Sequence, residues 1–202
     1  MLDITVGCIP MEFGFKGERS YIQGPDLVNG VLSHFAGKEI QNVKFSIHGF
    51  INTPHCTLSI YAADPKNNTG EFRGYLTRDG KKWWLEITAR DQKSGVENRS
   101  PYDENAIISQ CNIEGKQVSL TGRSAYSFME TIVSMTKLLL TELIRPTGGK
   151  WIFTAIEIDE YFDLRENLSI KLLHNFQNKL VKSEVLSDDV RVGIIYFSLV
   201  KP

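Results

Sequence analysis

The pattern of apolar and polar positions divides the chain into one long helix, one shorter helix and many short strands. Apolar residues lie nearly all round residues 124–144, and only a narrow stripe that includes Glu130 and Ser134 is polar. A helix that is apolar on almost every side is buried. Ser124 can cap its start, and the proline and glycines of residues 145–149 end it, because proline cannot continue the helical hydrogen bonds.

The remaining segments are read from their periodicity and from their turn residues. A shorter helix is expected over residues 24–35, where Pro25 suits a first helical turn. The predicted strands are residues 4–9, 11–15, 18–23, 43–47, 57–62, 71–77, 82–89, 106–113, 117–120, 150–162, 168–176, 179–186 and 191–200. Residues 93–105 lie in a polar stretch with Gly95 and Pro101, and they form the expected linker.

The order of elements before the linker is repeated after it. Residues 17–24 align with residues 115–122, and residues 57–60 align with residues 167–170 at an offset about a dozen residues larger. We assign most of this difference to the second helix, which is then about three turns longer than the first. A unit that cannot bury its own helix is expected to share a core with a second unit. The prediction is one domain made of repeat one (1–92), the linker (93–105) and repeat two (106–202).

Composition and charge narrow the classes of function. The chain has 202 residues, a formal net charge of −1 and three cysteines. A charge near zero gives no indication of nucleic acid or a membrane surface, and no apolar run reaches the roughly 18 residues that span a bilayer. The N-terminus does not resemble a signal peptide, and an odd number of unevenly spaced cysteines fits reduced thiols in the cytoplasm. His48, His55 and Cys56 are close in sequence, but no second cluster completes a metal site, so neither a metal nor a cofactor is expected.

Helices followed by antiparallel strands with short hairpin connections disfavour a doubly wound parallel sheet. A long apolar helix beside enough strands to wrap around it resembles the hotdog fold, and two such repeats resemble a double hotdog. The expected fold class is therefore α+β, with two β-α-β-β-β-β repeats and a long antiparallel sheet wrapped around central helices. Residues 127–135 followed by 148–156 are similar to the helix–loop–strand of the β-hydroxyacyl-ACP dehydratases, whose helix reads roughly P-G-V-L-x-x-E-A-x-A-Q. The AfsA-like hotdog proteins have a comparable segment.

The resemblance also carries implications for a site. It places Glu130 where those dehydratases carry their catalytic carboxylate, and Ser134 where they carry glutamine. Their catalytic histidine would fall on Lys116, so the histidine–carboxylate pair is absent from its familiar positions. In repeat one, the same alignment puts Leu32 at the position of the acid and Glu18 at that of the histidine.

Several residues are candidates for chemistry, each with a structural alternative. Glu130 either reaches solvent or an ion-pair partner, or it is a partly buried acid that exchanges a proton at an acyl thioester. His34 and His48 are the candidate catalytic bases, although a lone histidine is more often a packed or surface residue. The candidate substrate-binding residues are Asn29, Arg123, Tyr126 and Ser134. Backbone amides at residues 24–26 and 122–124, near the helix starts, could polarise a thioester carbonyl.

The resemblance implies a cytoplasmic protein that binds an acyl chain as a thioester on coenzyme A or an acyl carrier protein. As an enzyme it would be a lyase or hydrolase with dehydratase- or thioesterase-like chemistry in fatty-acid or polyketide-type metabolism. One alternative is a degenerate, non-catalytic hotdog protein that acts as a binding or scaffold partner. Another is an unrelated α+β domain with a ligand cradle. The sequence leaves this choice open, together with homodimer formation.

Overall fold

The computed structural model describes residues 7–35, 39–66, 68–90, 98–101, 103–144, 148–161 and 165–200. The chain divides into two compact units, residues 1–102 (unit 1) and residues 103–202 (unit 2). The boundary falls inside the expected linker, of which residues 93–97 and 102 lie outside the described residues. Residues 4–6 of the first predicted strand, residue 162 of another and residues 145–147 of the predicted helix stop also lie outside them. That the two units share one core stays a prediction.

Unit 1 contains an antiparallel sheet whose strands follow the order β1-β4-β6-β5-β3. These strands are β1 (Gly7–Glu12), β3 (Ile40–Ile47), β4 (His55–Tyr61), β5 (Phe72–Arg78) and β6 (Lys81–Ala89). A short parallel pair, β2 (Phe15–Lys16) with β7 (Arg99–Ser100), lies outside this sheet. Every neighbouring pair in the sheet is antiparallel, as the sequence predicts for these segments.

The sheet of unit 1 has one apolar face, because its strands alternate buried and exposed positions. In β3, Val43 and Phe45 are each 1% exposed, whereas Lys44 between them is exposed. Successive side chains of a strand point to opposite faces, so Val43 and Phe45 share one face, here called the inner face. The inner face continues with Leu58 and Ile60 of β4, Phe72 and Leu76 of β5, and Leu85 and Ile87 of β6. The opposite side, the outer face, carries polar and aromatic side chains.

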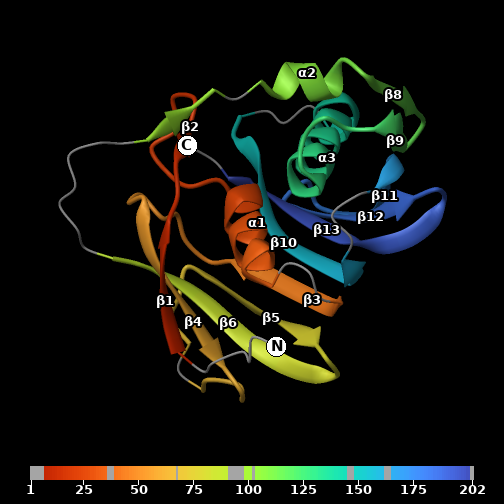
Figure 1. Cartoon of the computed structure of the whole chain (residues 1–202). Helices are drawn as coiled ribbons and strands as arrows, with labels where there is room; N and C mark the ends of the chain where they lie inside the picture. The colour runs from red at the N-terminus through yellow and green to blue at the C-terminus, as the bar shows by residue number, and fades with distance from the viewer. Residues whose placement is uncertain are drawn as a thin grey trace. The chain divides into compact units, whose positions relative to one another are not determined.

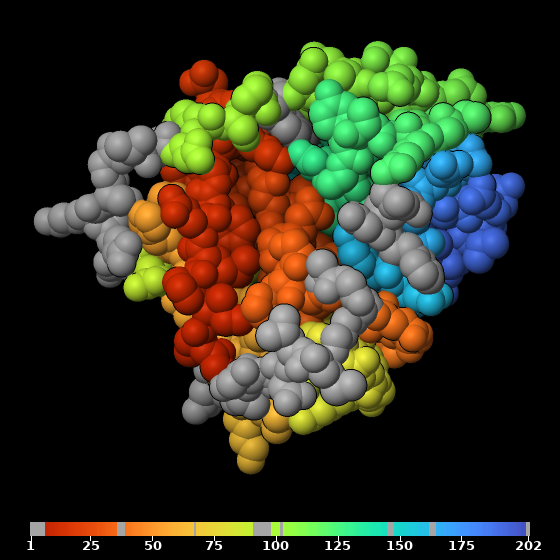
Figure 2. Space-filling model, in the orientation of Figure 1, coloured from red at the N-terminus to blue at the C-terminus, as the bar shows by residue number. Residues whose placement is uncertain are grey.

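Helix α1 (Gly24–His34) packs on the inner face of unit 1. Its buried residues are Pro25, Leu27, Val28, Val31 and Leu32. Figure 1 shows α1 lying across the strands of this unit. A Cβ atom added at Gly30 would lie 2.6 Å from the ring of Phe13 and 3.0 Å from the side chain of Met11, so glycine lets β1 and the segment after it approach the helix closely. The atoms of β1 (red) and α1 (orange) accordingly lie next to each other in Figure 2.

Unit 2 contains an antiparallel sheet whose strands follow the order β10-β13-β12-β11-β9-β8. The strands are β8 (Cys111–Glu114), β9 (Gln117–Arg123), β10 (Lys150–Tyr161), β11 (Glu166–Phe176), β12 (Leu180–Ser187) and β13 (Val190–Val200). Its helices are α2 (Glu104–Ile108) and the long helix α3 (Phe128–Ile144). Both units therefore follow the chain order strand, helix and four strands that the sequence predicts.

The long helix is buried, but it begins four residues later than predicted, at Phe128. Its buried residues are Phe128, Met129, Thr131, Ile132, Val133, Ser134, Met135, Thr136, Leu139 and Leu140. On its polar stripe, Lys137 forms an ion pair with Glu104 at 2.7 Å, which holds α2 against α3. Figure 2 shows the light-green atoms of α2 packed on the green atoms of α3.

Several local predictions are wrong. One continuous strand, β1, passes through Pro10, where the sequence predicts two strands on either side of the proline. Residues 18–23 form a loop instead of a strand, because Ile22 donates its amide to the carbonyl of Ile51 (2.9 Å) and no sheet partner is formed in the described residues. The predicted strand 106–113 begins as helix α2, because the Asp103 side chain accepts the amide of Ala106 (3.1 Å) and caps it. Helix α3 has 17 residues and α1 has 11, so the difference of six residues is about two turns rather than three.

Candidate functional site

A pocket of about 290 Å³ opens at the start of α3 in unit 2. It is lined by Arg123, Ser124, Ala125, Tyr126, Ser127, Phe128, Thr131, Arg165 and Leu168. The volume is at the small end of the range for small-molecule sites. Two of the residues proposed from sequence for substrate binding, Arg123 and Tyr126, lie in its wall.

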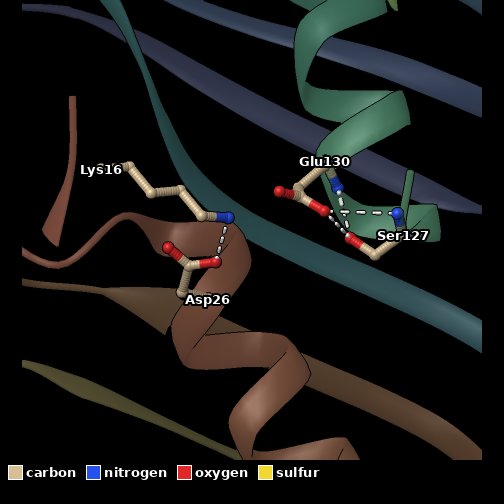
Figure 3. A network of polar contacts seen from close by, with 4 residues as sticks. All are labelled: Lys16, Asp26, Ser127 and Glu130. Carbon is tan, nitrogen blue, oxygen red and sulfur yellow. Dashed lines mark hydrogen bonds and ion pairs between the residues drawn. The ribbon is translucent and has the colours of Figure 1, made fainter. Parts of the chain in front are cut away.

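Glu130 stands beside this pocket and is held by the residue that caps the helix. The carboxylate oxygen Oε2 accepts hydrogen bonds from the Ser127 hydroxyl (2.6 Å) and from the Ser127 amide (3.2 Å). In return, the Ser127 hydroxyl oxygen accepts the amide of Glu130 at 3.3 Å. This reciprocal arrangement is a capping box, shown on the green helix in Figure 3. The half-buried Glu130 therefore has a structural role at the helix start, whatever chemistry it performs.

Ser124 shapes the wall of the pocket and does not cap the helix. Its hydroxyl oxygen accepts the amide of Tyr126 (3.1 Å) and the hydroxyl of Thr131 (2.8 Å). Thr131 lies one turn into α3 and is fully buried. The two bonds fix the turn between β9 and α3, and they delay the start of the helix to Phe128.

Two arginines give the pocket a positive wall. Arg123 is exposed at the end of β9 and lies opposite Glu166 of β11. Arg165 is half-buried, with its guanidinium 5.7 Å from the ring centre of Phe128, and it donates a hydrogen bond to the carbonyl of Glu160. Burial lowers the pKa of Arg165, against the opposing effect of Glu160 and Tyr161. Sequence reasoning missed Arg165, because only the pairing of β9 with β11 brings it near Arg123.

Two of the expected backbone donors already have partners in the structure. The amide of Gly122 donates to the Asn167 side chain (2.8 Å), and the amide of Asp26 donates to the carbonyl of Gln23 (3.0 Å), so both are already engaged. The amides of Phe128 and Met129 lie in the first turn of α3, where no preceding helical carbonyl can accept them. The positive end of the helix dipole is located there as well. Of these two residues only Phe128 lines the pocket, so its amide is the better candidate for polarising a carbonyl group.

The structure does not bring the predicted histidines into a common site within a unit. In unit 1, His34 is exposed at the end of α1, and its ring meets that of Phe35 edge-on at 5.4 Å. His48 is exposed on the outer face, where its Nε2 atom lies 2.8 Å from the Ser46 hydroxyl. Because α1 lies on the inner face, His34 and His48 lie on opposite sides of the sheet.

Unit 2 offers Glu130 no histidine of its own. The one histidine in residues 103–202 is His174. Strand β11 pairs Glu166 with Arg123 beside the pocket, and His174 lies eight residues further along the strand. At a rise of about 3.3 Å per residue, this is roughly 26 Å away. Lys116, which takes the place of the dehydratase histidine in the alignment, is exposed in the turn before β9, at the end of the strand away from Arg123.

The other two predicted binding residues have different surroundings. Ser134 is 0% exposed on α3, one turn beyond Glu130, and does not line the pocket. In unit 1, Asn29 lines a second pocket of about 360 Å³ together with Lys16 and Asp26. Lys16 and Asp26 form an ion pair at 2.6 Å (Figure 3).

The start of α1 also changes the alignment of the two repeats. Asp26 is the third residue of α1, as Glu130 is the third residue of α3. By helix position Asp26, and not the buried Leu32, therefore corresponds to Glu130. The sequence alignment missed this because it treated residues 18–23 as a strand.

The described residues set some further limits on the site. No helix among them is both long enough and apolar enough to cross a membrane. Within the same residues, no group of three or more His, Cys, Asp and Glu side chains is placed to hold a metal ion.

The three cysteines are free thiols. Burial, and then the negative charge of Glu71, raises the pKa of the Cys56 thiol to about 12.

Comparisons with known proteins identify the fold. No family model matches the chain, and no curated protein matches its sequence. A thioesterase II structure from Thermobifida fusca YX matches with a TM-score of 0.52 and 8% identity, over 98% of this chain and 93% of that one. The dehydratase domain of RzxB from Pseudomonas fluorescens matches with a TM-score of 0.50 and 10% identity, over 95% and 94%. The tesB protein of Mycobacterium avium subs paratuberculosis matches with a TM-score of 0.50 and 12% identity, over 100% and 95%.

These neighbours are hotdog-fold proteins. The chain itself has the hotdog fold over nearly its whole length, as an α+β protein with two β-α-β-β-β-β repeats. This confirms the fold class that the sequence predicts.

Proposed function

We propose that the protein binds an acyl thioester carried on coenzyme A or an acyl carrier protein, with the thioester carbonyl at the start of α3. The observation that carries this proposal is the pocket of about 290 Å³ where the first turn of α3 meets Arg123 and Arg165. The likeness to hotdog proteins described as a dehydratase domain and a thioesterase supports the ligand class. A cytoplasmic location and homodimer formation stay predictions.

The lining suggests how each part of the ligand is held. The amide of Phe128 would donate to the carbonyl oxygen, which carries the developing negative charge in acyl chemistry. Phe128 and Leu168 would contact the acyl chain. Arg123 and Arg165 would bind the phosphate of the phosphopantetheine arm, since guanidinium groups bind phosphate with two parallel hydrogen bonds.

Two functions could follow from this binding. Dehydratase- or thioesterase-like catalysis would use Glu130 to move a proton, with the Ser127 hydroxyl at 2.6 Å as its immediate partner. Non-catalytic binding, as a scaffold or carrier partner, is favoured by two observations. The Glu130 carboxylate is engaged in the capping box, and unit 2 contains no histidine near it.

Binding is tested by calorimetric titration with octanoyl-4′-phosphopantetheine, which contains the thioester, the arm and a phosphate but no nucleotide. We expect saturable binding that weakens at least tenfold in R123Q/R165Q, because each charge-assisted hydrogen bond contributes about 1.5–3 kcal/mol. The variant K171Q, in which an exposed lysine of β11 outside the pocket is changed, is the matched control and should bind as the wild type does. Absence of saturable binding, or equal affinity in R123Q/R165Q, would refute the proposal.

Turnover is tested with E130Q. Glutamine retains the capping box but cannot exchange a proton, so it separates the structural role from the chemical one. If the protein is an enzyme, E130Q should lose at least 100-fold in hydrolysis or dehydration of acyl and 3-hydroxyacyl thioesters while keeping its melting temperature. E142Q, at an exposed position of α3, is the control. Full turnover in E130Q removes Glu130 from the mechanism, and binding by the wild type without any turnover identifies the non-catalytic function.

A further inference from the structure

The outer face of unit 1 contains a third pocket, of about 370 Å³, that the acyl-binding proposal does not use. We call it the outer-face pocket. It is lined by Lys44, Ser46, His48, Asp64, Pro65, Lys66, Asn68, Arg73, Gly74, Tyr75 and Trp84. The pocket lies on the side of the sheet opposite α1, within unit 1 alone.

Strand register gathers the floor of the outer-face pocket. Ser46 of β3 lies opposite Arg73 of β5, and Tyr75 of β5 lies opposite Trp84 of β6. Cross-strand partners point to the same face of a sheet, so these side chains stand side by side. All four are half-buried, as expected for a concave polar surface.

The connection from β4 to β5 forms the wall of the outer-face pocket. Arg73 donates a hydrogen bond to the carbonyl of Asn68, and the Asn68 side chain accepts the amide of Gly70 at 3.2 Å. These bonds tie the described part of the connection to the sheet. Lys66 and Asp64, on the same connection, also line the pocket.

The outer-face pocket is electropositive although the protein is not. Lys44, Lys66 and Arg73 oppose one carboxylate, Asp64, so the lining carries a formal charge of 3 − 1 = +2. The whole chain has a net charge of −1, so positive charge is concentrated here. A concave surface with one sign of charge attracts ligands of the opposite sign.

Two further titratable groups, His48 and Glu86, lie near these charges. Burial, and then the positive charge of Arg73, lower the pKa of His48 below its usual 6.5, so the imidazole is neutral at pH 7. It remains a hydrogen-bonding partner of the Ser46 hydroxyl. Glu86, opposite Arg73 on β6, accepts the Tyr61 hydroxyl at 3.1 Å and does not line the pocket.

An aromatic pair completes the outer-face pocket. The rings of Tyr75 and Trp84 meet edge-on with centroids 5.1 Å apart. The ammonium of Lys82 lies 3.5 Å from the centre of the Tyr75 ring and 4.3 Å from that of Trp84. Aromatic rings beside cations bind planar bases by stacking and phosphates by charge, as in nucleic-acid-binding grooves.

We propose that the outer-face pocket binds a nucleotide, with its phosphates at Arg73, Lys44 and Lys66 and its base against Trp84 and Tyr75. Aromatic rings beside cations favour a ligand with a planar base as well as phosphates over a sugar phosphate, and the positive lining disfavours an apolar chain. A volume of about 370 Å³ is within the range of small-molecule sites. Free nucleotides and the nucleotide end of coenzyme A share this chemistry. The inference uses unit 1 alone and does not depend on the acyl-binding proposal.

Calorimetric titration of the full chain with ADP tests the inference. We expect saturable binding in the micromolar to low millimolar range. Adenosine and ribose 5-phosphate should each bind at least tenfold more weakly, because adenosine lacks the phosphates and ribose 5-phosphate lacks the base. R73Q should weaken ADP binding at least tenfold. K66Q should weaken it severalfold and, because Lys66 is exposed, it cannot act through folding. The control K171Q, on an exposed position of unit 2, should leave ADP binding unchanged.

The following results would overturn the inference or identify the ligand. Absence of saturable ADP binding, or affinity unchanged in both R73Q and K66Q, would overturn it. Equal affinity for ADP and ribose 5-phosphate, or no effect of Trp84→Leu, would overturn the assignment of the base. Titration with coenzyme A distinguishes the source: tighter binding than ADP, lost in R73Q, identifies the coenzyme, whereas weaker binding identifies a free nucleotide. Octanoyl-4′-phosphopantetheine has no base and ADP has no acyl thioester, so the two titrations test the two proposals separately. Either proposal can fail while the other holds.

Discussion

The two units use the same elements in the same chain order, yet they connect their sheets differently. From the strand after the helix, the order across the sheet is β3, β5, β6, β4 and β1 in unit 1. In unit 2 it is β10, β13, β12, β11 and β9. The hairpin in the middle of the sheet is β5–β6 in unit 1 and β12–β13 in unit 2. In unit 1 its first strand, β5, lies next to β3, whereas in unit 2 its second strand, β13, lies next to β10. All neighbours remain antiparallel in both.

The lengths of the connections explain this difference. Three residues, 177–179, join β11 to β12, and Gln177 and Asn178 adopt positive φ of 54° and 55° there. A turn this short can join only neighbouring strands. Ten residues, 62–71, join β4 to β5, which is enough to cross two strand spacings of about 4.8 Å each. The longer connection also forms the wall of the outer-face pocket, so the difference in connection accounts for a site that belongs to unit 1.

A pair of glycines shows that the geometry of the sheet is conserved between the units despite the different connections. Gly74 of β5 pairs with Phe45 of β3, and a Cβ atom there would lie 1.8 Å from the carbonyl oxygen of Lys44. Gly193 of β13 pairs with Ile158 of β10, and its Cβ would lie 2.2 Å from the carbonyl oxygen of Glu157. In both units the obstructing carbonyl belongs to the residue before the paired one. Close backbone approach at this point is therefore a property of both sheets, and only glycine permits it.

The largest effect is expected from filling these two positions. G74A and G193A should each destabilise the protein by about 3 kcal/mol or more, because the added methyl group meets backbone atoms that cannot move aside. Urea unfolding followed by circular dichroism measures this. G115A is the control: Gly115 has φ of 56° but no atom within 4 Å of an added Cβ, so only the left-handed strain of about 1 kcal/mol applies. A loss below 1 kcal/mol at either position would show that the two sheets do not share this close approach.

A smaller effect should distinguish the two helix starts. The third residue of α1 is held by an ion pair with Lys16, whose side chain is 16% exposed, whereas that of α3 is held by the hydroxyl and amide of Ser127. K16A leaves the carboxylate of Asp26, 17% exposed, without its ammonium partner and should cost about 2 kcal/mol, between the values for surface and buried pairs. S127A removes a helix cap and should cost about 1 kcal/mol. Chemical denaturation of both variants compares them, and a larger loss in S127A than in K16A would reverse the comparison.

The smallest effect concerns the ionisation of His48 in the outer-face pocket. Its pKa is lowered by burial and by the positive charge of Arg73, so the imidazole should titrate below pH 6.5. R73Q removes one of the two causes and should raise the midpoint toward 6.5, while burial still holds it below that value. NMR titration of the imidazole protons measures both midpoints. A midpoint that falls in R73Q would show that Arg73 does not act on this histidine.

The sequence alone determined the elements whose signal is local. The apolar residues of α3 and α1 and the alternation of β3, β5 and β6 are visible in short windows, because burial of one face requires a fixed period. The order strand, helix and four strands, twice over, together with the long apolar helix, resembles the hotdog fold and led to that prediction. Of the residues proposed for a site, Arg123 and Tyr126 line the pocket at the start of α3, and Glu130 stands beside it.

Tertiary structure decided everything that depends on contacts between distant segments. Arg165 reaches the pocket because β11 pairs with β9, and the outer-face pocket exists because ten residues carry the chain across its own sheet. The start of α3 was settled by reciprocal hydrogen bonds between Ser127 and Glu130, which compete with a cap at Ser124. The first two features have no period or motif in the sequence, because strand pairing and the path of a connection fix them. Ser127 and Glu130 do match the S-x-x-E motif of a capping box, but the sequence also offers Ser124 as a cap, and only the structure shows which serine caps the helix.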